Sequence, residues 1–171
     1  MKEFTKEQLK DYVLSIINET NIIYAVKKGY TIAVQGAVGE EVITYEIDSE
    51  DNEYIERTGK VSLDKKTNKP AWILTKTDSD NKPVVNKYGH TNRYILSDSE
   101  FKERYNPTDK ENLFTKSKIE KFIKLDEDIS FETEEGLMVA KSGGYLMITN
   151  IDDISCISNQ SFIDTYEIKK H

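Results

Sequence analysis

Cysteine and histidine are scarce in this chain of 171 residues, which has one of the former and two of the latter. A single cysteine cannot form a disulfide within the chain, and this fits a reducing cytoplasm. Cys156 lies in an apolar stretch, so we expect a buried, unreactive thiol. Neither histidine has a second histidine or a cysteine at metal-ligand spacing. We therefore expect no metal site and no cofactor.

Long apolar runs are also missing. No stretch is long enough to cross a bilayer. Charged side chains interrupt the N-terminal segment, where a secretory signal would need an apolar run. These charged residues are Lys2, Glu3, Lys6, Glu7 and Lys10. The sequence therefore predicts a cytoplasmic protein that does not contact membranes.

Positive charge is in short supply, because 24 lysines and arginines face 31 acids and leave a net charge of −7. This balance argues against direct binding of nucleic acid. Acids gather in two runs without lysine or arginine, from Glu40 to Glu56 and from Asp126 to Glu135. Such runs are mostly solvated strand faces and turns. The alternative is a surface for a basic partner, as in an acidic inhibitor of a nucleic-acid-binding host defence complex.

The sequence does contain a unit that occurs twice. In the first copy, an aromatic and β-branched run from Trp72 to Thr75 is followed by a polar loop and a second apolar run that ends at Leu96. A helix start follows at once, because Ser97 can form a capping box with Glu100. The pattern predicts a strand, a loop, a second strand and a short helix.

The second copy ends at Tyr166 and follows the same plan, with Ser158 as the helix cap and no reciprocal glutamate. Phe162 lies four residues before Tyr166, as Phe101 does before Tyr105, so each pair shares one face of its helix. We interpret the two copies as an internal duplication. Two unrelated hairpins that each lead into a helix are the alternative.

A resemblance to a known family comes from the stretches Pro70–Ile73 and Ser142–Leu146, each followed by a Phe-x-x-x-Tyr helix. They are similar to the PGDYG-type module of small bacterial and phage proteins. The match covers roughly residues 69–105 and 142–168. Neither copy has the full Pro-Gly-Asp-Tyr, because Ala71 replaces the glycine and Gly144 the aspartate. The resemblance implies a fold element and a bacterial or phage setting, and no reaction.

The remaining segments predict a helix that begins at Thr5 and several short strands. The expected strands are a hairpin of 22–26 and 30–34 that turns at Gly29, two strands at 42–47 and 54–61, and a meander of 129–132, 137–140 and 145–149. Residues 106–118 are polar and without period, and predict a linker. Residues 119–125 fit a helix or a strand, and we favour the strand.

The elements add up to an α+β fold of short antiparallel strands, one N-terminal helix and two short helices. We expect two lobes. Residues 1–109 form an N-terminal α+β lobe with the first unit, and residues 110–171 form a C-terminal β-rich lobe with the second. The side chains expected in the core are Leu9, Val13, Ile16, Trp72, Phe101, Tyr145 and Phe162.

The loop from Lys76 to Asn92 is the candidate functional segment. It is much longer than the turn of the second copy, and long loops on rigid hairpins often bind ligands. The candidate binding residues at its base and along it are Trp72, Tyr88, His90, Asn92, Arg93 and Tyr94. An insertion without function is the alternative.

No catalytic residues can be assigned, because no serine has the Gly-x-Ser-x-Gly setting of a hydrolase and the cysteine is expected to be buried. The sequence therefore predicts a non-enzymatic binding module, with a protein or a small ligand as its partner. An enzyme that uses His90 and Arg93 in the long loop is the alternative from another class.

Overall fold

The structure is a computed structural model that describes residues 1–133 and 136–169. Glu134 and Glu135 of the second acidic run and the second histidine, His171, lie outside the described residues. Strands make up 47% of the chain and helices 15%. The prediction of an α+β fold is therefore wrong, because this is a β-rich protein in which stretches expected to be loops pair as strands.

The helices and strands have the following bounds. The helices are α1 (Lys6–Ile16), α2 (Asp98–Arg104) and α3 (Asn159–Thr165). The strands of the first part are β1 (Lys2–Phe4), β2 (Ile22–Lys27), β3 (Thr31–Gln35), β4 (Glu41–Ile47), β5 (Glu53–Lys60), β6 (Trp72–Thr75), β7 (Arg93–Leu96) and β8 (Asn106–Pro107). The later strands are β9 (Leu113–Thr115), β10 (Ile119–Lys124), β11 (Ile129–Thr133), β12 (Gly136–Ala140), β13 (Tyr145–Asn150), β14 (Asp153–Ile157) and β15 (Tyr166–Lys169).

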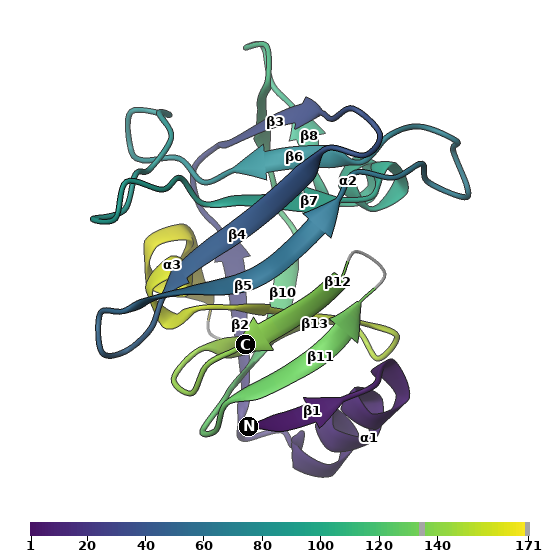
Figure 1. Ribbon diagram of the computed structural model, residues 1–171. Coiled ribbons are helices and arrows are strands. Elements are labelled where there is room, and N and C mark those ends of the chain that lie inside the picture. The colour runs from purple at the N-terminus through teal and green to yellow at the C-terminus, as the bar shows by residue number, and fades with distance from the viewer. Residues whose placement is uncertain (134–135, 170–171) are drawn as a thin grey trace.

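These strands form three sheets of five strands each. Sheet A has the order β1-β11-β12-β5-β4, sheet B the order β14-β13-β10-β2-β15, and sheet C the order β7-β6-β3-β9-β8. In Figure 1, sheet C lies at the top with α2 beside it, and α3 lies at the left. Sheet A runs obliquely across the front and ends at β1, beside α1 at the bottom.

Helix α1 begins where its sequence predicts. Thr5 Oγ1 accepts the Gln8 N–H at 3.2 Å, and Gln8 Oε1 accepts the Thr5 N–H at 2.9 Å, so the capping box is present. Leu9 and Val13 are buried against the core that sheets A and B share. Ile16, which was also expected in the core, is only partly buried because it lies in the last turn of the helix.

The same order of elements occurs twice after α1. The first repeat runs from β2 to β8 through the β4–β5 hairpin and α2, and the second runs from β9 to β15 through the β11–β12 hairpin and α3. Corresponding strands also take corresponding places in sheets C and B. The two strands of the unit come first in each sheet, β7 and β6 in sheet C and β14 and β13 in sheet B. Next come a strand that precedes the unit (β3 or β10), a strand from the other repeat (β9 or β2), and the strand that follows the helix (β8 or β15). This topology supports an internal duplication that extends well beyond the two units.

The two repeats exchange one strand each. β2 pairs with β10 and β15 in sheet B, whereas β9 pairs with β3 and β8 in sheet C. The predicted hairpin of β2 and β3 is therefore wrong. The turn at Gly29, which has a φ of +76°, instead carries the chain from one sheet to the other. The predicted boundary near residue 110 falls just before β9, between the two repeats. Because β2 and β9 are exchanged, sheets B and C each contain one strand from the other repeat.

Two further sequence assignments change. The segment 106–118 is not a linker, because it contains β8 and β9, and strand pairing uses backbone groups that polar residues also carry. The predicted meander is split, since β11 and β12 pair in sheet A while β13 pairs with β10 and β14 in sheet B. Residues 119–124 form a strand, β10, as we favoured.

Helices α2 and α3 are attached to their sheets by the aromatic pairs that the sequence indicated. Phe101 is 2% exposed and Phe162 is 3% exposed, and Tyr105 and Tyr166 are buried beside them. Each helix begins at a serine whose Oγ accepts the N–H three residues later. Trp72 is only partly buried, although it packs edge to face on Phe101.

Candidate functional site

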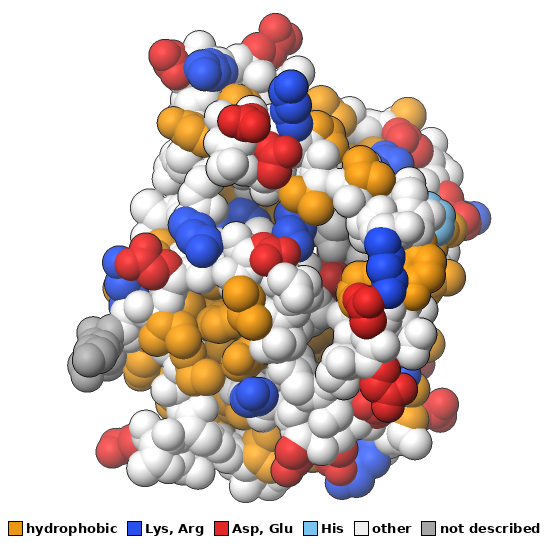
Figure 2. Space-filling model, turned by 90° about the vertical axis from the view of Figure 1, so that its left-hand side faces the viewer, with side chains coloured by type: hydrophobic (Ala, Val, Ile, Leu, Met, Phe, Trp, Pro, Cys, Tyr) orange, Lys and Arg blue, Asp and Glu red, His pale blue; other side chains and the backbone are white. Residues whose placement is uncertain are grey.

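A cavity of about 420 Å³ lies between the two repeats. Its wall comes from β4, β5, β7 and α2 of the first repeat, from β13, β14 and α3 of the second, and from the exchanged β2. Figure 2 shows the face that carries α3, where lysine and arginine side chains gather around a hollow. The volume lies within the range of roughly 300–1,000 Å³ that is usual for small-molecule sites.

The strand exchange brings two equivalent lysines to this cavity. Lys27, the last residue of β2, lies opposite Tyr166 in the pair of β2 and β15. Lys116 is the equivalent residue of the second repeat. It directly follows β9, and the register of β8 and β9 places it opposite Tyr105, as Lys27 is opposite Tyr166. Both ammonium groups lie over the Tyr166 ring, each Nζ 5.7 Å from its centroid. Lys116 Nζ also donates to the Tyr166 hydroxyl at 3.2 Å.

Three of the cations that line the cavity are paired with acids. The pairs are Lys76 with Asp164 (Nζ to Oδ2, 2.8 Å), Lys116 with Glu120 (Nζ to Oε1, 3.6 Å) and Arg104 with Asp153. Lys27 differs, because its ammonium group makes no hydrogen bond or ion pair with any residue that the structure describes.

The pKa values of the two equivalent lysines reflect this environment. Burial, together with the positive charges of Lys116 and Lys76, lowers the pKa of Lys27 to about 7. Burial also lowers the pKa of Lys116, to about 8, although the carboxylate of Glu120 opposes the shift. The Lys27 ammonium is thus a cation for which the protein supplies like charges and no counter-charge.

Three tyrosine hydroxyls supply neutral hydrogen-bonding groups at the same place. The hydroxyls of Tyr94 and Tyr105 lie 3.2 Å apart, and the Tyr166 hydroxyl contacts Lys116. Burial raises the pKa of all three phenols. They therefore remain protonated at neutral pH and can donate to an anion.

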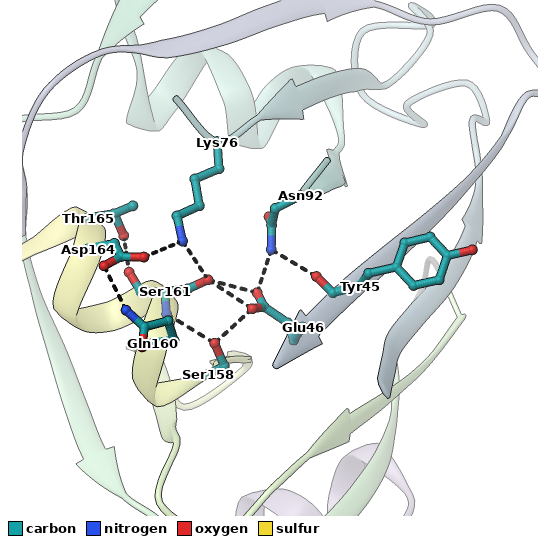
Figure 3. Close-up of polar contacts among 9 residues, drawn as sticks. All are labelled: Tyr45, Glu46, Lys76, Asn92, Ser158, Gln160, Ser161, Asp164 and Thr165. Atoms are coloured by element: carbon teal, nitrogen blue, oxygen red, sulfur yellow. Dashed lines mark hydrogen bonds and ion pairs between the residues drawn. The ribbon is translucent and has the colours of Figure 1, made fainter. Parts of the chain in front are cut away.

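The wall of the cavity next to Lys76 is a polar network that joins the two repeats (Figure 3). Glu46 of β4 is 6% exposed. Its carboxylate accepts from Asn92 Nδ2 at 2.7 Å, from Ser158 Oγ at 2.7 Å and from Ser161 Oγ at 2.9 Å. Burial raises the pKa of Glu46, while these hydrogen bonds oppose the shift. Since Ser158 also caps α3, the network fixes that helix to the first repeat.

Another part of the wall is apolar. It belongs to the core cluster that α1 shares with sheets A and B. The side chains of that cluster and its margin that line the cavity are Leu9, Met138, Ile151, Ile154 and Cys156. The cysteine thiol is buried, as predicted, and burial raises its pKa well above the ordinary value. The cavity thus offers cationic and apolar surfaces to one occupant.

Glu56 leads to a prediction for the pH dependence of stability. It is 5% exposed, and its Oε2 has no hydrogen-bond partner among the described residues. Burial and then the Glu46 carboxylate raise the pKa of Glu56 well above its ordinary value, although Arg57 opposes this. Because the folded state binds this proton more tightly than the unfolded state, stability falls as the pH rises through the raised pKa.

Glu56→Gln removes the buried charge and should raise the free energy of unfolding at neutral pH by about 1–2 kcal/mol. The gain should disappear near a pH of about 4, where the wild-type carboxyl is protonated in both states. Thermal melts of both proteins across that pH range measure the difference. Glu41→Gln, at an exposed position on β4, is the control. Parallel pH profiles for wild type and Glu56→Gln would contradict the assignment.

The first acidic run does not form a charged surface as a whole, because Glu46 and Glu56 point into the interior. The run lies on β4 and β5, whereas the described part of the second run lies at β11, and β12 separates β11 from β5 in sheet A. The arrangement gives the acidic-inhibitor hypothesis no support.

Of the six residues predicted as a binding site, Asn92 and Tyr94 line the cavity. Trp72 does not, because its indole N–H donates to Asp98 of α2 at 2.8 Å. Arg93 lies near Glu40, with 3.7 Å between Nη2 and Oε2.

Tyr88 and His90 lie on the outside of the molecule. The Tyr88 hydroxyl donates to the Asp51 carbonyl at 2.9 Å. His90 stacks on the Tyr45 ring at 3.8 Å, and its Nδ1 lies 2.8 Å from Glu53 Oε2. The long loop is thus attached to the β4–β5 hairpin by its own polar side chains, and it does not place His90 in the cavity.

Sequence reasoning missed the lysines that define the cavity. Lys27 lay in an expected turn, Lys76 at the start of an expected loop, and Lys116 in an expected linker. The one available signal was that Lys27 and Lys116 each follow a run of strand-forming residues. Recognising them as equivalent requires the strand register, which the two units alone do not give.

The fold and the cavity define a class: a β-rich protein of two strand-exchanged repeats with a cavity at their junction that both cationic and acidic side chains line. No protein-family model matches the sequence, and no curated protein and no solved structure matches the chain. None of the helices in the described part of the chain is both long and apolar enough to cross a membrane.

Proposed function

We propose that the protein binds a small phosphorylated molecule in the cavity between its repeats and does not catalyse a reaction. The observation that carries this proposal is Lys27, a cation at a cavity wall without an acidic partner, next to Lys116 and the Tyr166 hydroxyl. Its neighbours Lys76, Arg104 and Lys116 each already have a carboxylate.

A phosphate monoester suits this group of side chains. It carries up to two negative charges and presents three terminal oxygens, which can accept from ammonium groups and phenol hydroxyls at once. The apolar part of the wall is suited to an organic body attached to the phosphate. A cavity of about 420 Å³ admits a metabolite. The acidic surface elsewhere disfavours nucleic acids and anionic membranes, and we propose the cytoplasm as the compartment.

Replacing Lys27 with methionine tests the proposal. Calorimetric titration of the wild type with pyridoxine 5′-phosphate should give saturable binding, and inorganic phosphate should compete. Lys27→Met should weaken the affinity by about 10- to 100-fold, the effect of losing a charge-assisted hydrogen bond. The variant should still fold, because it removes a partly buried cation that has no counter-charge.

The matched control is Lys28→Met, because Lys28 is the exposed neighbour in sequence. Its affinity should equal that of the wild type. Wild-type affinity should also fall as the pH rises from about 7 to about 9, since the bound anion favours the protonated lysines and each proton must then be taken up. Absence of binding, or equal losses in both variants, would overturn the proposal.

A further inference from the structure

We propose that Lys27 is a nucleophilic amine that captures a carbonyl group of the bound molecule as an imine. This inference rests on the proposed function, because Lys116 and the Tyr166 hydroxyl would hold the anionic group of the ligand and so bring its carbonyl to the neutral form of Lys27. It adds a chemical feature that binding alone does not require: an aldehyde or ketone on the phosphorylated molecule.

Two features together distinguish Lys27 from the other lysines that line the cavity: it is partly buried, whereas Lys6 and Lys66 are exposed, and it has no carboxylate partner among the described residues. Asp164 and Glu120 hold the protons of Lys76 and Lys116 by ion pairs, whereas no carboxylate contacts Lys27 within the described residues. Lys27 is partly buried at the end of β2 and lines the cavity, so a ligand there can reach its amine.

The groups that face Lys27 favour its neutral form. They are Lys76, which follows β6, Lys116, which follows β9, and the Tyr166 phenol at the start of β15. The two ammonium groups oppose a third positive charge, and the phenol remains neutral. A desolvated lysine beside other cations is the usual environment of an amine that forms Schiff bases. The pKa of about 7 agrees with this.

The step is balanced without an oxidant or a reductant. The lone pair of the neutral Lys27 amine forms a bond to the carbonyl carbon, and the carbonyl π electrons move to oxygen. The oxygen then leaves as water with the two protons that the amine loses, and a carbon–nitrogen double bond remains. The Lys116 ammonium, 3.2 Å from the Tyr166 hydroxyl, is placed to relay one of these protons: it donates a proton to the departing oxygen and takes back one that the amine loses.

Reductive trapping of the full chain tests the inference. Pyridoxal 5′-phosphate carries both an aldehyde and a phosphate, and borohydride supplies the hydride that converts its imine to a stable secondary amine. At limiting reagent and neutral pH, peptide mass mapping should place most of the label on Lys27. Lys27→Met should lose about tenfold or more of the total label, whereas Lys28→Met should keep it. Label spread over exposed lysines, with Lys27 not preferred, would overturn the proposal.

Pyridoxine 5′-phosphate, which lacks the aldehyde, separates this inference from the proposed function. If it binds and competes with the labelling of Lys27, both stand. If it binds and Lys27 is not labelled, the imine is wrong and the binding site stands. If it does not bind and Lys27 is still labelled preferentially, the amine is reactive and the phosphate site is wrong. If neither occurs, both are wrong.

Discussion

Replacing Phe101 with alanine should lower the free energy of unfolding by about 3–5 kcal/mol, the usual cost of deleting a buried aromatic ring. Phe101 is 2% exposed and is surrounded by edge-on rings. Its centroid lies 4.2 Å from that of Trp72, 4.8 Å from that of Phe114 and 5.2 Å from that of Tyr105. The alanine would leave a cavity that these large rings cannot readily fill. Urea unfolding of the two proteins measures the loss.

The exposed Glu103 on the same helix provides the control, because Glu103→Ala should change stability by less than about 0.5 kcal/mol. Phe162→Ala should cost as much as Phe101→Ala, since Phe162 packs on Tyr145 at 4.2 Å and on Phe122 at 4.9 Å. Because the repeats exchange β2 and β9, each substitution should destabilise the whole molecule in a single transition. A Phe101→Ala midpoint equal to that of the wild type would show that the ring is not part of the core.

Glu46→Ala should cost about 2–4 kcal/mol, because it removes the one acceptor that two buried donors and one partly buried donor share. Asn92, Ser158 and Ser161 all donate to the Glu46 carboxylate. The buried charge itself is unfavourable, as the raised pKa of Glu46 shows, but removing the carboxylate leaves the buried hydroxyls of Ser158 and Ser161 without their acceptor, while Asn92 keeps only the Tyr45 carbonyl. Chemical denaturation at neutral pH measures the loss.

Glu46→Gln keeps one acceptor oxygen at this position and should cost less than the alanine variant. Glu41→Ala, on the same strand and exposed, should be nearly neutral. The network also predicts a local effect, because Ser158 both caps α3 and donates to Glu46. Amide hydrogen exchange in α3 should therefore accelerate in Glu46→Ala more than exchange in α2. Equal protection of the two helices in the variant would refute the bridging role of Glu46.

Local interactions made several features of this protein predictable. The capping box of Thr5 and Gln8 and the serine caps of α2 and α3 depend on residues three apart. The burial of Phe101 and Phe162 follows from their spacing on a helix face. The unit of strand, loop, strand and helix could be read twice for the same reason: both strands and the helix have their own local signals.

The partners of the strands could not be predicted in this way. β2 and β3 are separated by a short turn with a glycine, which is the pattern of a hairpin, yet they lie in different sheets. Polar residues around 106–118 gave no strand signal, although β8 and β9 form there. Strand pairing is made by backbone groups that every sequence shares, so the choice of partner depends on which apolar faces the rest of the chain must cover.

The candidate site, like the strand pairing, could not be predicted from local interactions. The sequence by itself determined the α1 and aromatic-helix elements, the duplication of the unit, the excess of acids and the burial of Cys156. Only the tertiary structure placed Lys27, Lys76 and Lys116 around one cavity, because residues far apart in sequence meet there through the exchange of β2 and β9. A lysine in a turn and one in a loop are each ordinary surface residues in sequence. Their desolvation and mutual repulsion exist only once the sheets close around them.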